Sequence, residues 1–282
     1  MFKILEKREL NSSMTLMTVD APFIARKVRA GQFIILRVNE HGERIPLTVA
    51  DYDREKGTVT IIFQIVGKTT AILNELNEGD FIQDFIGPLG KASELEGYKR
   101  AAVIGGGAGC AIAYPQAKAL HAMGARVDMI AGFRNKDIII LEDEMAAASD
   151  KLIVTTDDGS NGNKGFVTDA LKARIEEGAD YDLVVAIGPL PMMRAVCNLT
   201  KEYGIKTIIS MNPIMIDGTG MCGGCRVRVG GETKFACVDG PDFDGHLVDF
   251  DEAIARTRTY REKEAEAMRE HQCRLMGGKP NA

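Results

Sequence analysis

The sequence lacks any long apolar run, since no stretch approaches the ~20 apolar residues that a membrane-spanning helix needs. The opening segment MFKILEKREL also lacks the apolar core of a secretory leader, because charged residues interrupt it early. These absences predict a chain that neither crosses a membrane nor enters the secretory route. The cytoplasm is therefore the expected location.

Excess charge of either sign is also missing. The 282 residues include 35 Lys and Arg against 40 Asp and Glu, for a net charge of −5, and both signs are mixed along the chain. Without a basic stripe, nothing favours a nucleic-acid partner or an anionic membrane surface. Internal repeats of the solenoid type are absent as well.

Cysteine is sparse, and half of it lies in one run. Six cysteines without a leader suit a reducing compartment better than a disulfide scaffold. Asp217, Cys222, Cys225 and Cys237 form the pattern Asp-x4-Cys-x2-Cys-x11-Cys, the ligand spacing of a plant-type [2Fe-2S] loop whose first cysteine is replaced by aspartate. Glycines between these residues allow positive φ angles and close backbone approach. The run predicts an iron–sulfur cluster that carries electrons.

Zinc is the alternative for these four residues. A structural zinc ion accepts the same ligand types, although zinc sites more often show two separated Cys-x2-Cys pairs. Cys110, Cys197 and Cys273 lie outside the run and are expected to be small buried or idle thiols.

Two regions of different composition make up most of the chain. Residues 1 to 98 contain segments such as GQFIILRV and GTVTIIFQIVG, rich in β-branched and aromatic residues, which predict a small antiparallel β-barrel. Residues 99 to 211 alternate apolar strands, such as AAVIGGG and DLVVAIGP, with helical stretches. This alternation predicts an α/β domain with a doubly wound parallel sheet.

The remaining residues divide at the end of the cysteine run. A small iron–sulfur loop domain is expected over 212 to 250, and a charged helical tail over 251 to 282, ending in Gly-Pro-Asn. The tail has helical spacing but no strong apolar face. It therefore fits either a docking element or a solvated terminal helix.

Three loops of the α/β domain are candidates for binding a nucleotide. The run VIGGGAGCAIAYP follows a predicted strand and opens a predicted helix, where glycines let backbone amides approach a pyrophosphate. AIGPLPMM and TDDGSNGNKG also follow strands, and ligands of open sheets gather at the carboxyl ends of strands. One such turn is often free of ligand, but three together favour a nucleotide. The predicted binding residues are Gly105, Gly106, Gly107, Ala108, Gly109, Gly188 and Pro189.

Asp157 and Asp158 follow the third predicted strand of this domain. A carboxylate there can accept hydrogen bonds from a ribose and repel a 2′-phosphate, which favours NAD(H) over NADP(H). The same residues also fit a turn that only ends the strand. Arg134 and Lys136 follow the second strand and can hold a phosphate, so charge alone leaves the cofactor choice open.

The order of barrel, glycine-rich domain and cysteine loop resembles the ferredoxin–NADP reductase superfamily, in particular the electron-transfer subunit of B-type dihydroorotate dehydrogenases. With aspartate as first ligand, and with GERIPLTVAD and TDDGSNGNKGFVTDAL, it more closely resembles the small, alpha subunits of NADH-dependent reduced ferredoxin:NADP oxidoreductases. The resemblance runs from about residue 2 to residue 250.

This resemblance implies an FAD held against the barrel. Arg44 would pair with the flavin pyrophosphate, Pro46 would pack beside the ring and Thr48 would offer it a hydroxyl, although the family's arginine usually precedes the hydroxyl residue by three positions and here the gap is four. Ile187-Gly188-Pro189 stands where the family often has Cys-Gly-Pro beside the nicotinamide. The full set of implied flavin contacts is Arg44, Pro46, Leu47, Thr48, Gln64, Val66, Gly67, Thr69, Thr70, Gly87 and Pro88.

The resemblance also implies the activity. NADH would deliver a hydride to FAD, and single electrons would pass through the cluster to a larger subunit with a second FAD and [4Fe-4S] clusters, where NADPH and ferredoxin are handled by electron bifurcation. Two alternatives stay open: the electron-transfer subunit of an NAD-dependent dihydroorotate dehydrogenase, in which four cysteine ligands are usual, and a non-catalytic iron–sulfur redox sensor.

Overall fold

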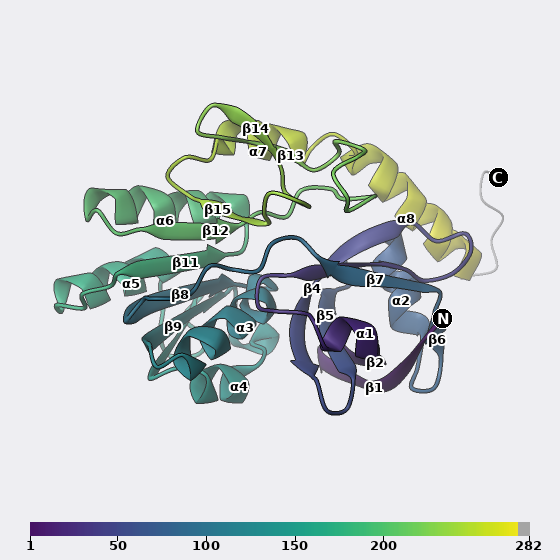
Figure 1. Cartoon of the computed structure of the whole chain (residues 1–282), viewed down its shortest axis with the longest axis horizontal. Coiled ribbons are helices and arrows are strands. Elements are labelled where there is room, and N and C mark those ends of the chain that lie inside the picture. Colours follow the sequence, from purple (N-terminus) through teal and green to yellow (C-terminus); the bar gives the residue numbers. More distant parts are fainter. Residues whose placement is uncertain (276–282) are drawn as a thin grey trace.

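The computed structural model describes residues 1–275, with side chains described through residue 273. The end of the expected tail, residues 276–282, lies outside the described residues. Figure 1 shows three parts: a barrel, an α/β part beside it, and a green and yellow part that lies across the α/β part and sends a helix back over the barrel.

The barrel is a nearly closed antiparallel sheet with the strand order β6-β1-β2-β5-β4-β3-β7. Its edge strands β6 and β7 are separated by a single residue of chain, so the sheet almost closes on itself. Side chains that alternate inward, such as Ile34 and Leu36 of β3, are fully buried and form the barrel core. The strands are β1 (Phe2–Asn11), β2 (Met14–Asp20), β3 (Phe33–Arg37), β4 (Arg44–Asp53), β5 (Thr58–Gln64), β6 (Phe81–Ile82) and β7 (Asp84–Leu89), with helices α1 (Pro22–Ala25) and α2 (Lys68–Glu75).

The α/β part has five parallel strands in the order β10-β9-β8-β11-β12. Its central strands β8 and β11 are almost uniformly buried, as continuous apolar runs in a parallel sheet should be. The strands are β8 (Arg100–Gly106), β9 (Arg126–Phe133), β10 (Lys151–Thr156), β11 (Leu183–Ile187) and β12 (Thr207–Ser210); the helices are α3 (Gly109–Ala122), α4 (Glu142–Ala147), α5 (Val167–Glu176) and α6 (Leu190–Glu202), with a 3₁₀ turn η1 (Lys136–Ile138).

Both sheets confirm the predicted fold class. The strand order of the α/β part reverses between β8 and β11, and open α/β sheets bind ligands at such a switch point, outside the carboxyl ends of the strands.

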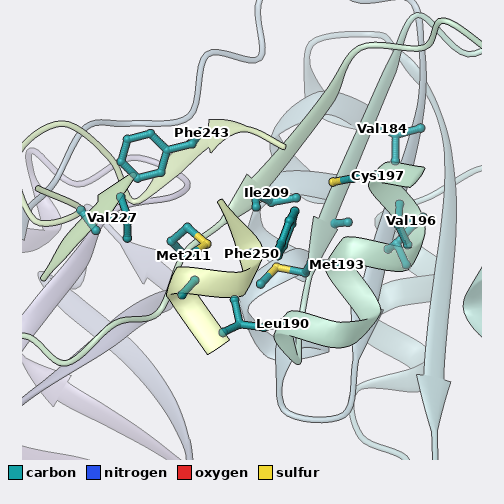
Figure 2. Packing of buried hydrophobic residues seen from close by; sticks show 14 of the residues in the cluster. Val184, Leu190, Met193, Val196, Cys197, Ile209, Met211, Val227, Phe243 and Phe250 are labelled. Atoms are coloured by element: carbon teal, nitrogen blue, oxygen red, sulfur yellow. The ribbon is translucent and has the colours of Figure 1, made fainter. Parts of the chain in front are cut away.

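The cysteine-containing part is joined to the α/β part by a shared sheet and a shared core. It contains β13 (Arg226–Val229), β14 (Glu232–Phe235), β15 (Asp242–Asp244), α7 (Phe250–Arg256) and α8 (Arg261–Leu275). Strand β15 pairs antiparallel with β12 and becomes the sixth strand of the α/β sheet. Figure 2 shows Phe243 and Phe250 of this part beside Ile209, Met211 and side chains of α6, all in one buried cluster. The two parts therefore pack as one unit.

Polar contacts also hold the barrel on the α/β part. Lys118 of α3 lies 2.8 Å from both carboxylate oxygens of Asp51 on β4, and Arg8 of β1 lies 3.0 Å from Glu144 of α4. Such partly exposed pairs add little stability individually, and both connect the barrel with the α/β part. The described chain, residues 1–275, contains no helix that is both long and apolar enough to span a bilayer.

Candidate functional site: a cleft and a cysteine loop

A cleft of about 1090 Å³ lies between the barrel and the carboxyl ends of the parallel strands. Its size and mixed apolar and polar walls suit a large organic cofactor. From the predicted set, the residues that line it are Pro46, Leu47, Thr48, Gln64, Gly106, Gly107, Ala108, Gly109, Asp157, Gly188 and Pro189. The structure thus brings the barrel strand and the glycine loops to one cavity.

The glycine-rich loop lets the chain turn sharply from β8 into α3. A Cβ on Gly109 would come within 2.3 Å of the carbonyl oxygen of Ile187, so only glycine lets α3 begin this close to β11. Gly107 has a φ of +55°, and a Cβ built on it would have no heavy atom within 4 Å. The amide groups at the start of α3 therefore lie next to an open cavity, where a pyrophosphate can be bound.

Several predicted flavin contacts lie outside this cleft. Val66, Gly67 and Thr70 form the turn between β5 and α2, where the Thr70 hydroxyl accepts bonds from the amides of Val66 and Gly67, both at 3.1 Å. Gly67 has no heavy atom within 4 Å of a Cβ built on it, which leaves room for a ligand at the start of α2. The other predicted residues that do not line the cleft are Arg44, Thr69, Gly87, Pro88, Gly105 and Asp158. Their binding roles stay predictions.

The two adjacent aspartates differ in position. Asp157 lines the cleft, together with Arg134 of the loop after β9. Asp158 does not; its carboxylate accepts a bond from the amide of Ser160 at 2.9 Å. Hydrogen bonds from Ser160 lower the pKa of Asp158. Of the two, only Asp157 lines the cleft, where its contact with a ribose stays a prediction; Asp158 fits the turn interpretation.

The three cysteines of the run lie close together. Cys222 and Cys225 come just before β13, and Cys237 follows β14. Cys225 and Cys237 are buried and Cys222 is exposed. Two backbone amides donate to their sulfurs at 3.5 Å: that of Cys237 to Cys225, and that of Gly224 to Cys222. Burial, followed by the neighbouring thiol of Cys225, raises the pKa of Cys237 to about 12. Thiols with amides aimed at their sulfurs have the donor chemistry of an iron–sulfur site.

Asp217 lies in the same loop, with its carboxylate turned to the loop backbone. Oδ2 accepts bonds from Thr219 N (2.9 Å), Thr219 Oγ1 (2.5 Å) and Met221 N (3.2 Å). Those bonds, led by the Thr219 hydroxyl, lower the pKa of Asp217, and the positive charge of Arg44 contributes. All three bonds use Oδ2, which leaves Oδ1 for a metal. Within residues 1–275, no three His, Cys, Asp or Glu side chains are arranged as a finished metal site, so the ligand role of Asp217 stays a prediction.

Strand β3 connects the cleft with the cysteine loop. Phe33 lines the cleft, and Ile35, two residues along the strand, packs at the loop, where a Cβ on Gly218 would lie 2.8 Å from its Cδ1. Two residues of strand span roughly 7 Å. The loop therefore lies within a short distance of the cleft wall.

Sequence analysis missed part of the cleft. Phe33, Phe166, Met192, Ser210 and Pro241 line it but were not predicted as binding residues. Met192 and Phe166 lie in segments that the sequence analysis had singled out, and Ser210 ends the fifth parallel strand, where ligands gather.

Comparison with known proteins identifies the relatives of this chain. Residues 212–249 match the iron-sulfur cluster binding domain of dihydroorotate dehydrogenase B, and residues 103–198 match the oxidoreductase NAD-binding domain. A Thermotoga maritima protein named as a homologue of the dihydroorotate dehydrogenase B (NAD(+)) electron transfer subunit is 46% identical over 93% of this chain and 92% of its own. A Clostridium beijerinckii protein encoded in the adh 3′ region is 52% identical over 96% of this chain and 94% of its own.

A solved structure agrees with these matches. A chain in the structure of the NADH-dependent reduced ferredoxin-NADP oxidoreductase, studied for flavin-based electron bifurcation, superposes with a TM-score of 0.90 at 43% identity, covering 94% of this chain and 95% of that one. These findings confirm the resemblance that the sequence motifs indicated. The chain belongs to the family of dihydroorotate dehydrogenase B electron-transfer subunits and their homologues, and it is an oxidoreductase subunit that works with FAD, NAD(H) and a [2Fe-2S] cluster.

Proposed function

We propose that this chain is the NAD(H)-handling subunit of a larger cytoplasmic complex and passes electrons between NAD(H), FAD and its [2Fe-2S] cluster. The partner is a larger subunit that carries a second FAD and [4Fe-4S] clusters and handles NADPH and ferredoxin by electron bifurcation. The observation that carries the proposal is β3, which borders the cleft at Phe33 and the cysteine loop at Ile35. This arrangement puts a one-electron carrier next to the site of two-electron chemistry.

The residues of the cleft bind and orient the reactants. FAD supplies the conversion between two-electron and one-electron transfer. Pro46, Leu47 and Thr48, which line the cleft on the barrel side, would hold the flavin, and the amides at the start of α3 would bind the nicotinamide dinucleotide near Gly107. Gly188 and Pro189, which also line the cleft, would contact the nicotinamide. Hydride transfer needs no thiol there, which agrees with Ile187 in the place of the family's cysteine.

In the cysteine loop, Cys222, Cys225, Cys237 and Asp217 would hold the cluster. Carboxylate is a harder and weaker donor to iron than thiolate, so Asp217 adjusts the reduction potential. Arg44 provides a positive charge next to this ligand. It thereby serves the cluster loop rather than only a flavin phosphate.

The identity of the partner subunit distinguishes this function from the second candidate, electron transfer in dihydroorotate oxidation. The family match is equally compatible with an electron-transfer subunit of dihydroorotate oxidation. The 43% identity to a chain of the ferredoxin-NADP oxidoreductase, together with aspartate as first ligand, favours the bifurcating system. A redox sensor is disfavoured, because a sensor needs no cleft shared by flavin and nicotinamide groups.

The experiment is anaerobic purification from the native cell, followed by identification of the co-purifying subunit. We expect FAD, roughly equal iron and acid-labile sulfide at about two of each per chain, and rapid bleaching of the flavin band by NADH. A dihydroorotate-oxidising partner would replace the first candidate with the second. Zinc in place of iron, or a flavin that NADH leaves oxidised, would contradict both.

A further inference from the structure

A buried polar cluster lies where the three parts of the molecule meet. Asp242 of β15 accepts a hydrogen bond at Oδ2 from the hydroxyl of Ser93 at 2.5 Å, and another from the amide of Gln116 on α3 at 3.3 Å. Ser93 follows the barrel and packs against Gly31, where a Cβ would come within 2.0 Å of the serine oxygen. Only a glycine at position 31 leaves room for this cluster.

Two acceptors in this cluster have no donor. Asp242 Oδ1 and Gln116 Oε1 are both inaccessible to solvent and have no hydrogen-bond partner among the described residues. Leaving such a buried group unsatisfied costs roughly 1–3 kcal/mol, and more for a charged one. A proton on Asp242 would supply the cluster with a donor, which its two unpartnered acceptors lack, and would remove the buried charge.

The surroundings of Asp242 carry no compensating cation. Burial raises the pKa of Asp242 to about 6, and hydrogen bonds from Ser93, Ser210 and Gln116 offset only part of this effect. The charged side chains on the elements packed around it are engaged elsewhere or face solvent: Lys118 of α3 pairs with Asp51, Lys206 before β12 contacts Tyr98, and Lys91, Glu94 and Asp244 are exposed.

Asp242 is connected to the cleft through Ser210. The two residues are directly opposite each other in the β12–β15 pairing, and Ser210 itself lines the cleft. Pro241, the residue before Asp242, lines the cleft as well. The carboxyl therefore lies one residue behind the cleft wall, on the strand position paired with Ser210.

We propose that Asp242, acting through Ser210, accepts the proton that leaves the cleft during turnover. When a hydride is delivered by NADH and its two electrons depart one at a time, one proton is left behind, and it must go to a base. Asp242 takes this proton, becomes a neutral acid that can donate within the cluster, and then releases the proton to water through Ser93, the partly exposed residue whose hydroxyl is bonded to Oδ2. The role rests on the proposed function, since it needs flavin and nicotinamide in this cleft.

The test combines a spectroscopic and a kinetic measurement on the complete, cofactor-loaded protein. Infrared difference spectra between pH 5 and pH 8 should show the band of a protonated carboxyl group that titrates near pH 6, absent from Asp242→Asn and present in the matched control Asp244→Asn. The control residue lies two positions along the same strand and is exposed. In the kinetic arm, protein reduced by one equivalent of NADH is mixed with ferricyanide, and the return of flavin absorbance is followed.

The expected rate of reoxidation falls about tenfold from pH 8 to pH 5 in the wild type, in proportion to the ionised fraction of Asp242. Asp242→Asn should be at least tenfold slower at pH 8 and nearly independent of pH, as for loss of a general base. Ser210→Ala should be slow as well while it keeps the infrared band. Flavin bleaching by NADH, which needs no proton acceptor, should change less than about twofold in Asp242→Asn.

Several results would overturn the proposal. One is that Asp242→Asn keeps the wild-type rate and pH profile of flavin reoxidation. Another is that Ser210→Ala is reoxidised as fast as the wild type. A third is that the wild type shows no titrating carboxyl band. An equal loss of bleaching and reoxidation in Asp242→Asn would assign the residue a purely structural role. If that variant fails to fold, the wild-type infrared titration and Ser210→Ala still decide. Absence of flavin, or of bleaching by NADH in the wild type, would instead contradict the proposed function.

Discussion

Replacing Asp242 with asparagine should stabilise the protein, by an amount that grows with pH. The carboxyl is held in the fold at a pKa of about 6, above its ordinary value of 3.8, because it is buried without a cation. A carboxyl whose pKa is raised on folding favours the folded state at low pH and opposes it as the pH rises through the folded pKa. Asparagine has the same shape, supplies a donor to the cluster, and carries no charge at any pH.

The magnitude follows from the two pKa values. At about 1.4 kcal/mol for each tenfold change in proton affinity, the rise from 3.8 to about 6 costs the folded wild type at most about 3 kcal/mol above pH 7. Roughly half of that penalty is present at pH 5 and almost none near pH 3.5. Because Asp242 as a whole is only half-buried, this figure is an upper bound.

Scanning calorimetry at pH 5 and pH 8 measures the effect. For a chain of 282 residues, 3 kcal/mol corresponds to a shift in Tm of about 5 °C, so the variant should gain about 2 to 3 °C at pH 5 and up to about 5 °C at pH 8. Asp244→Asn is the matched control, and its Tm should show no gain that grows with pH. A difference between variant and wild type that stays constant from pH 5 to pH 8 would refute the reasoning about burial.

Three further predictions concern the cleft and the loop. Asp157→Asn should raise the ratio of NADPH to NADH rates in stopped-flow flavin reduction, whereas Asp158→Asn, whose carboxylate faces its own turn, should leave it unchanged; equal effects would exclude a ribose contact for Asp157. Asp217→Cys should keep the cluster with an altered potential, and Asp217→Ala should lose iron or hold it less firmly; an unchanged spectrum and potential in the alanine variant would remove Asp217 from the ligand set. Gly109→Ala places a Cβ 2.3 Å from the carbonyl oxygen of Ile187 and should weaken NADH binding and destabilise the fold by about 1–3 kcal/mol, as measured by titration and calorimetry; a variant with wild-type affinity would show that α3 can shift without cost.

The local sequence pattern was sufficient to predict both sheets. The strands of the α/β part are apolar runs, and β8 and β11 lead directly into glycine-containing turns. Because the carboxyl ends of parallel strands meet at one edge, Gly107, Asp157 and Gly188 could be placed near one another from the sequence. Thr48 and Gln64 lie across the same cleft, as the resemblance implied. The contact roles of these residues stay predictions.

Contacts between residues far apart in the chain could not be predicted from the sequence. Ser93 and Asp242 are 149 residues apart and lie in no motif, so only the folded chain brings them together. Strand β15 has three residues, too few for a period-two pattern to show. The tail was recognised as helical, but its break between α7 and α8, and the position of His271 of α8 at 3.3 Å from Glu75 of α2, depend on tertiary packing.

The pairing of β15 with β12 has a consequence for assembly of the protein. On that side, β12 has no neighbour except three residues contributed from beyond the cysteine loop. A nascent chain whose loop has not yet ordered therefore leaves Ile208 and Ile209 on an open strand edge, with unpaired backbone groups that can join a second chain. Pairing with β15 is therefore what protects this edge from joining a second chain.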